Sequence, residues 1–221
     1  GSWVQAVANL PEQLRNRFPS SIPPAAVVPT FLDKGLFAAC LDSERIAQPI
    51  TRIVRTLEDL EKVPKEIFPN AFMKPRDSES FFSRFRVKGI FAPDLAAARE
   101  HFRRLSADGA EVVLPEYIVG PTTNQYLIDG FVDRQGEIRA LLTRQKIRMY
   151  PPSFGNPCSQ VTVPRDKLGH AIDDLKRLLK RTEYRGIFSA EFKFDPRDNI
   201  FKLLEINARP YWYIAFTCHS G

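Results

Sequence analysis

The chain has 221 residues, of which 43% are hydrophobic, and it carries a formal net charge of +6 at pH 7. This length is enough to bury one sizeable core or two smaller subdomains that share one. No apolar run approaches the roughly 20 residues that a membrane-spanning helix needs, and no apolar leader stands at the start, so we expect no membrane partner.

Residues 1–30 are expected to form a linker segment. We interpret Gly1-Ser2 as a cloning remnant. A short helical pattern then leads into SSIPPAAVVP, a proline-rich stretch that favours extended backbone. This beginning suggests that the chain starts in the middle of something larger.

Residues 31–118 are predicted to form a first α+β subdomain. Its helices are expected at 31–46, near 57–63 and at 94–105, where Asp94 is the predicted N-cap. Short strands are expected at 51–55, 71–74, 87–91 and 111–118. The polar sequence RDSESFFSRFR at 76–86 is predicted to be a loop.

Residues 119–221 are predicted to form a second α+β subdomain with longer strands. Strands are expected at 125–132, 138–149 and 160–163. An amphipathic helix is predicted at 165–182, and its inward side chains are Leu168, Ile172, Leu175, Leu178 and Leu179.

The basic residues bear on the kind of partner. A positive net charge favours anionic partners, and both nucleic acids and nucleotide phosphates qualify. The most clustered basic residues belong to the 165–182 helix and are better explained as a solvated helix face: Lys176, Arg177, Lys180 and Arg181. Cys40, Cys158 and Cys218 lie far apart without metal-ligand spacing, as is typical of reduced thiols in a cytoplasmic protein.

The segment 186–209, GIFSAEFKFDPRDNIFKLLEINAR, is predicted to be a hairpin closed by a three-residue turn at 197–199. In that register Glu191 lies directly opposite Glu205, and Asn207 shares their face one pleat along. Two facing carboxylates repel each other, and Mg²⁺ held by oxygen ligands together with phosphate would offset that repulsion. Arg209 is suited to bidentate contact with a phosphoryl group. The alternative is an exposed hairpin with ordinary surface charges.

Other polar residues occur at element ends in a fixed order. Asp33-Lys34 opens the first helix, and Lys74 ends a strand just before the polar loop. Leu-Pro-Glu-Tyr-Ile-Val-Gly at 114–120 ends another strand, and Arg144, Lys146 and Arg148 alternate along a later one, which predicts that they share a face. A helix-start lysine, a strand-end lysine and a solvated strand face are the structural alternatives. The chain has no P-loop and no GxGxxG, HExxH or GxSxG motif.

In this order of parts the chain resembles the ATP-grasp domain of carboxylate–amine ligases. The resemblance covers about residues 30–217 and includes the E-x-N-x-R form of Glu205–Arg209. RMYPPSFG after the basic strand makes the chain most similar to carboligases related to D-aspartate ligase. The resemblance implies an α+β ATP-grasp fold, with a nucleotide cleft between two subdomains.

The resemblance also assigns expected roles, with ATP and Mg²⁺ as cofactors. Lys34 and Lys74 match the lysines that contact the phosphates of ATP. Glu116, Tyr117 and Ile118 match the linker whose backbone binds the adenine edge, and the Ile118 side chain is expected to pack against the base. The expected metal ligands are Glu191, Glu205 and Asn207, and the expected catalytic residues are Arg209, Arg148 and Lys146. The polar loop departs from the family pattern because it lacks glycine, and no ribose-binding acid is evident after the linker. The resemblance also implies that the chain is a fragment, because the substrate domain that normally precedes Lys34 in the family is expected to be missing.

The implied activity joins a small-molecule carboxylate to an amine through an acyl-phosphate, with ATP converted to ADP. Two other hypotheses stay open. One is a nucleotide-binding module without ligase turnover. The other is a basic nucleic-acid-binding domain, although no basic motif interleaved with aromatic residues supports it. The sequence does not indicate the oligomeric state.

Overall fold

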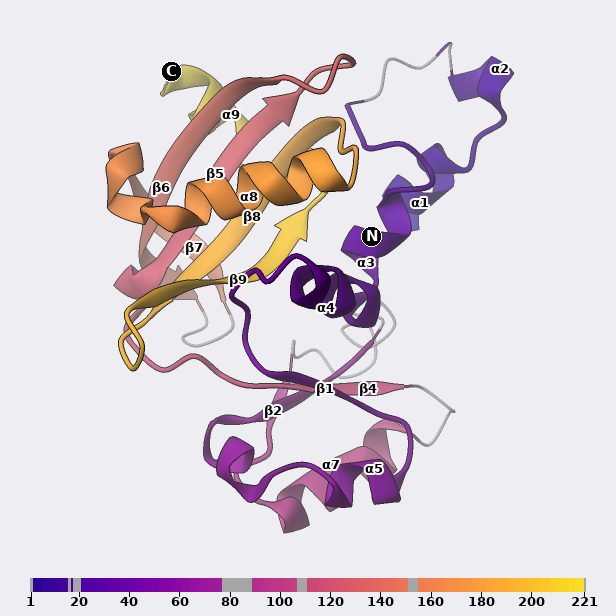
Figure 1. The fold of residues 1–221 in the computed structure, drawn as a ribbon, viewed down its shortest axis with the longest axis vertical. Coiled ribbons are helices and arrows are strands. Elements are labelled where there is room, and N and C mark those ends of the chain that lie inside the picture. The colour runs from indigo at the N-terminus through magenta and orange to yellow at the C-terminus, as the bar shows by residue number, and fades with distance from the viewer. Residues whose placement is uncertain are drawn as a thin grey trace.

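The computed structural model describes residues 2–15, 17, 21–76, 89–106, 111–150 and 155–220. It contains two antiparallel sheets, which lie in separate parts of the molecule (Figure 1). The strand order is β1-β4-β2-β3 in the smaller sheet and β7-β6-β5-β8-β9 in the larger one. This arrangement confirms the predicted α+β class.

The smaller sheet is covered by helices on one side (Figure 1). Its elements are β1 (Thr51–Val54), α5 (Leu57–Glu61), the 3-10 helix η1 (Lys65–Asn70), β2 (Phe72–Pro75), β3 (Ile90–Phe91), α7 (Leu95–Leu105) and β4 (Val112–Pro115). Asp94 caps α7 as predicted, since its side chain accepts a hydrogen bond from the Ala97 amide. Buried side chains of α5, α7 and the strands form one core. The predicted loop at 76–86 lies outside the described residues except for Arg76.

The larger sheet packs one face against α8 (Figure 1). Its elements are the 3-10 helix η2 (Thr122–Asn124), β5 (Gln125–Val132), β6 (Ile138–Tyr150), β7 (Asn156–Thr162), the 3-10 helix η3 (Arg165–Leu168), α8 (His170–Arg181), β8 (Gly186–Asp195), β9 (Ile200–Asn207) and α9 (Ile214–His219). All five predicted inward side chains of the amphipathic helix are buried. The helix begins five residues later than predicted because Gly169, with φ 49°, separates it from η3.

The first 46 residues differ from the prediction. The expected linker contains α1 (Ser2–Ala8), α2 (Glu12–Arg15) and α3 (Val28–Leu32), and apolar side chains of α1 and α3 share a small core. The expected helix at 31–46 is α4 (Lys34–Ser43), which Asp33 caps by accepting a hydrogen bond from the Leu36 amide. Phe37 and Leu41 of α4 belong to the core of the larger sheet, so α4 packs with the second subdomain and not the first.

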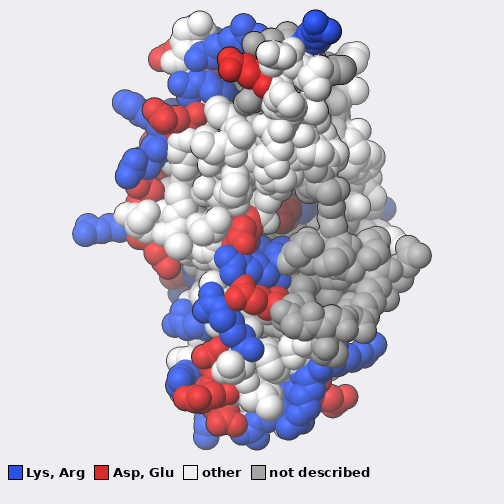
Figure 2. Space-filling view, turned by 90° about the vertical axis from the view of Figure 1, so that its right-hand side faces the viewer, with Lys and Arg blue, Asp and Glu red and all other residues white. Residues whose placement is uncertain are grey.

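The described part of the chain has no helix that is long and apolar enough to cross a membrane. Its three cysteines are free, and two of them are exposed. The predicted charge cluster on α8 is largely paired within the molecule: Lys176 with Asp173, Arg177 with Asp174, and Arg181 with Glu44. Figure 2 shows basic and acidic side chains interspersed on one face of the molecule, which is unlike a continuous basic stripe.

Candidate active site between the two sheets

The β8–β9 ladder places the three predicted metal ligands on one face of the larger sheet. Glu191 lies directly opposite Glu205, and Ser189 lies directly opposite Asn207. Side chains at opposite and alternate positions of an antiparallel ladder share a face, so the two carboxylates and the Asn207 amide are neighbours. The predicted pairing of Glu191 with Glu205 is confirmed.

The turn that produces this register is not the predicted one. Asp195 pairs with Ile200, so the loop has four residues, and Asn199 adopts the left-handed conformation with φ 59°. A register shift between Glu191 and Phe192 then leaves one residue of β9 unmatched. The longer loop and the bulge offset each other, and the pairing at Glu191 is therefore the same as for a three-residue turn without a bulge.

Lys146 lies at the centre of the polar face of the larger sheet and is nearly fully buried. Its Nζ donates to Glu191 Oε1 at 2.5 Å and to Gln125 Oε1 at 2.8 Å. One of the two facing carboxylates therefore has a cation beside it, which reduces the repulsion within the pair. Glu205 is exposed and stays open to a further ligand.

Arg148 lies outside this group, contrary to the prediction that it shares a face with Lys146. Lys146 pairs with Gln160, and Arg148 pairs with the adjacent Ser159, because a bulge interrupts β6 between them. Adjacent residues of a strand point to opposite faces, so Arg148 points away from the face of Lys146. Its side chain is exposed.

Arg144 shares the face of Lys146 as predicted, but it is not solvated. It is fully buried, with its Nε 2.6 Å from Asp129 Oδ2, and the Tyr213 ring centroid lies 4.4 Å from the guanidinium carbon. Thr217 of α9 also donates to Asp129 Oδ2, at 3.1 Å. This buried ion pair fastens the C-terminal segment to the sheet.

Arg209 lies next to the predicted metal ligands. Its Nη2 donates to Asn207 Oδ1 at 3.1 Å, and its Nη1 donates to the Pro210 carbonyl at 3.3 Å. Both contacts are local, and the side chain is half-buried. The guanidinium is thus oriented beside the amide that completes the group of three oxygen-bearing side chains.

The two predicted phosphate-binding lysines are contributed by other elements. Lys74 lies on β2 opposite Val113, and Lys34 is the first residue of α4, with its Nζ 3.3 Å from the Arg76 carbonyl. Desolvation and, after it, the charge of Lys34 lower the pKa of Lys74 to about 8, against the attraction of Glu205 and Glu191. Lysines and carboxylates from separate sheets therefore lie within electrostatic reach of one another.

Arg76 anchors the segments that carry these lysines. It forms ion pairs with Asp33, at 2.7 Å, and with Glu111. The capping residue of α4 is thereby joined to the end of β2 and to the chain just before β4. These contacts give Arg76 a structural role at the start of the predicted polar loop.

The predicted adenine linker crosses between the sheets. The Glu116 amide donates to the Ile50 carbonyl at 2.8 Å, and the Tyr117 amide donates to the Asn70 carbonyl. Among the residues that the structure describes, neither the Glu116 carbonyl nor the Ile118 amide has a hydrogen-bond partner, although Ile118 is 2% exposed. A buried amide without a partner is rare and suits a ligand that accepts a hydrogen bond.

Lys193 is a candidate that the sequence argument missed. It lies on β8 two residues after Glu191 and on the same face, with its Nζ 4.4 Å from the Tyr117 ring centroid. Desolvation lowers its pKa to about 8. The strand alternation placed it on the polar face, but nothing in the sequence indicated that it contacts the linker.

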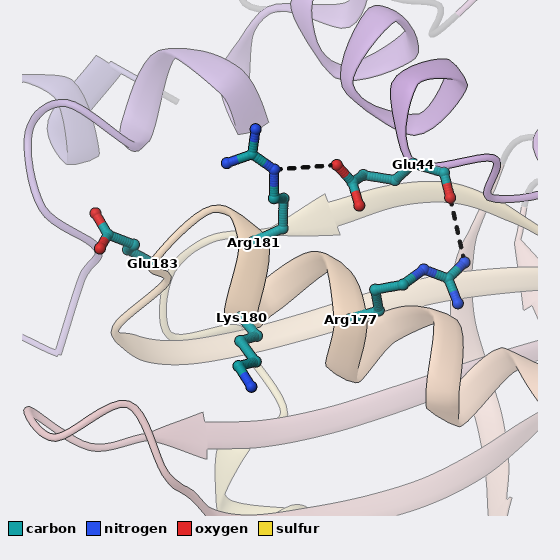
Figure 3. Close-up of a pocket in the computed structure, with 5 residues that line it drawn as sticks. All are labelled: Glu44, Arg177, Lys180, Arg181 and Glu183. Atoms are coloured by element: carbon teal, nitrogen blue, oxygen red, sulfur yellow. Dashed lines mark hydrogen bonds and ion pairs between the residues drawn. The ribbon is translucent and has the colours of Figure 1, made fainter.

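Other sites are less suited to the expected chemistry. Within the described ranges, no group of three or more His, Cys, Asp or Glu side chains is arranged to hold a metal. A surface pocket of about 630 Å³ lies at the end of α8, where Arg177 and Arg181 both contact Glu44 (Figure 3). This pocket is lined by α8, its C-terminal continuation and the residue after α4, and by none of the predicted site residues.

The chain is similar to known ligases in sequence and in fold. No family model matches the chain. Over 150 residues it is 28% identical to D-aspartate ligase of Enterococcus faecium (strain Aus0004), a match that covers 64% of this chain and 34% of that protein. The chain thus spans about a third of the length of this curated relative.

Solved structures show the same fold. The L-amino acid ligase from Bacillus licheniformis superposes with a TM-score of 0.64 at 18% identity, over 89% of this chain and 44% of that one. D-alanine–D-alanine ligase from Bacillus anthracis superposes with a TM-score of 0.62 at 14% identity, over 90% of this chain and 65% of that one. An ADP complex of N5-carboxyaminoimidazole ribonucleotide synthetase superposes with a TM-score of 0.65 at 14% identity, over 86% of this chain and 48% of that one. The chain therefore has the ATP-grasp fold and resembles the carboxylate–amine ligases built on it.

Proposed function

We propose that this chain is the ATP-binding core of an ATP- and Mg²⁺-dependent carboxylate–amine ligase. The observation that carries the proposal is the convergence of opposite charges from the two sheets. Desolvation lowers the pKa of Lys74 of the smaller sheet to about 8, and the charges of Glu205 and Glu191 of the larger sheet act against that lowering. Cations that suit phosphate and carboxylates that suit magnesium thus face the same space.

Glu191, Glu205 and Asn207 fit a magnesium ion that arrives with the nucleotide. They offer hard oxygen donors from neighbouring ladder positions, and few protein ligands are typical where phosphates complete the coordination. Held by these residues, Mg²⁺ would supply positive charge to neutralise the phosphate oxygens. Lys146 holds Glu191 in place through its 2.5 Å contact and places a cation beside the two facing carboxylates.

The remaining residues act on the phosphates and the base. Lys34 and Lys74 neutralise the triphosphate as ammonium groups, and Arg209 stabilises charge on the transferred phosphoryl group. The Glu116 carbonyl and the Ile118 amide provide one acceptor and one donor for an adenine edge. Arg148, which points to the other face of β6, is left out of this set.

The reaction proposed is attack of a carboxylate oxygen on the γ-phosphorus of ATP, with ADP as the leaving group. An amine then attacks the acyl carbon, the C–N bond forms, and inorganic phosphate leaves as the amine loses a proton. The names of the relatives, D-aspartate ligase and L-amino acid ligase, support amino acids as the substrate class. Free cysteines and the use of ATP support a cytoplasmic location.

A two-stage experiment tests the proposal. First, thermal unfolding is measured with ATP alone, Mg²⁺ alone, both together, and single-stranded RNA; stabilisation by the ATP–Mg²⁺ pair is expected and RNA should have no effect. Second, ADP release is measured with the longest natural chain against a panel of amino acids and dipeptides. Release that depends on a carboxylic acid supports the ligase. Stabilisation without release for any acid indicates a nucleotide-binding module instead, and no stabilisation contradicts both.

A further inference from the structure

Lys193 is a buried cation without an ionic partner. It is 3% exposed, and within the part of the chain that the structure describes its ammonium group has no hydrogen bond or ion pair. Its close contact is with the π face of Tyr117. A buried charge without a partner is costly and needs an explanation, and a ligand that supplies the partner is one.

The neighbouring carboxylates are already engaged with other cations. Glu191, two residues before Lys193, is bound by Lys146. Asp195, two residues after it, is bound by Arg197 and Lys202, both at 2.6 Å. Lys202 is the direct ladder partner of Lys193 and also contacts Asp198 at 2.9 Å. Both neighbouring lysines therefore have carboxylate partners, and Lys193 differs from them.

The linker defines which part of a nucleotide Lys193 faces. Tyr117, whose ring lies against the ammonium, stands between the unpaired Glu116 carbonyl and the unpaired Ile118 amide. These backbone groups suit the edge of a nucleobase. The phosphate-binding candidates Lys34 and Lys74 belong to α4 and β2, so the base end and the phosphate end have separate cations.

We propose that Lys193 is a base-binding residue, whose ammonium group donates a hydrogen bond to a ring nitrogen of a purine nucleotide held by the linker. This inference rests on the proposed nucleotide site and adds a specificity determinant to it. A purine offers N3 and N7 as ring acceptors outside the edge that the linker binds. Lys193 therefore selects for a base with an acceptor at one of these two positions.

Calorimetric titration of the whole chain in the presence of Mg²⁺ tests this inference. The ligands are ATP, 3-deaza-ATP, 7-deaza-ATP and inorganic tripolyphosphate, and the variants are Lys193→Met and Lys202→Met. Lys193→Met should weaken ATP binding by about tenfold or more, as for the loss of a hydrogen bond to a charged group. It should leave tripolyphosphate binding unchanged.

The deaza analogues identify the acceptor. One of them should bind the wild-type protein as weakly as Lys193→Met binds ATP, and Lys193→Met should not weaken its binding further. Lys202→Met, the matched control from the opposite ladder position, should lower stability but keep the affinity for ATP. Equal losses for ATP and both analogues, an equal loss for tripolyphosphate, unchanged ATP binding in Lys193→Met, or an equal loss in Lys202→Met would each overturn the inference. If the wild-type chain binds no ATP, the proposed function itself fails.

Discussion

Replacing Glu205 by glutamine tests two effects of the Glu191–Glu205 pair separately. One is the charge repulsion that lowers the stability of the ligand-free chain, and the other is the proposed binding of Mg²⁺. Two unit charges about 5 Å apart repel by roughly 0.8 kcal/mol at the dielectric constant of water. Lys146 already offsets part of this, and Glu205 is exposed. Glu205→Gln should therefore raise the stability of the ligand-free chain by less than about 1 kcal/mol, which corresponds to at most about 2–4 °C in Tm for a chain of this size.

The same change should weaken the response to ligand. At a concentration one hundred times its Kd, ATP–Mg²⁺ stabilises the wild-type chain by about 2.7 kcal/mol, and a tenfold loss of affinity leaves about 1.4 kcal/mol. The Tm increase caused by ligand should thus fall by about half in Glu205→Gln, measured by differential scanning fluorimetry with and without Mg²⁺. Glu137→Gln, at an exposed position just before β6, is the matched control and should respond like the wild type. If Glu205→Gln keeps the full magnesium-dependent shift, the metal assignment is wrong.

Three further outcomes follow from buried charges. Because the pKa of Lys74 is about 8, its ammonium form, which is the form proposed to bind phosphate, dominates below that pH. The affinity for ATP–Mg²⁺ should therefore decline from pH 7 to pH 9, and Lys74→Met should remove most of that decline. Calorimetric titrations at several pH values check this. Asp195→Asn should lower the free energy of unfolding, measured in urea at pH 7, by about 1–3 kcal/mol. The pKa of Asp195 is lowered by the hydrogen bond from Arg197, so its contribution is present above the unfolded value of about 3.9, and the difference from the wild type should shrink as pH falls below it. Arg144→Met should lower the free energy of unfolding by about 3–5 kcal/mol, because Asp129 is left buried without its cation. A variant as stable as the wild type in chemical denaturation would contradict that account.

Strand alternation was the most informative feature of the sequence. It predicted that Glu191 and Glu205 share a face and lie directly opposite each other, as the structure shows. The prediction holds although the loop has one residue more than expected, because the bulge in β9 cancels that difference before the ladder reaches Glu191. The same alternation predicted the wrong face for Arg148, because a bulge in β6 between Lys146 and Arg148 shifts the register by one residue. Bulges arise from tertiary contacts along the whole ladder, so a local pattern does not reveal them.

Helical periodicity indicated α4 but not the layer that it covers. An apolar stripe specifies that a face of the helix is buried but not which sheet covers it, and Phe37 and Leu41 belong to the core of the larger sheet. The proline-rich start was expected to be extended, but prolines are accepted in the first turn of a helix, as in α3. Lys193 was overlooked because its role depends on Tyr117, which is 76 positions away in sequence and adjacent only in the fold.

Two stretches of chain pass from one sheet to the other, one near Ile50 and one at Glu116, and a 2.8 Å backbone hydrogen bond ties them together. The Glu116 carboxylate also reaches Arg197 at the tip of the β8–β9 hairpin, at 2.6 Å. Arg76, just after Lys74, makes a second link, because it binds Asp33, the cap of the helix that packs with the larger sheet, at 2.7 Å. The smaller sheet is therefore held to the rest of the molecule at two separate places, and moving the two sheets apart requires breaking at least one of these ion pairs.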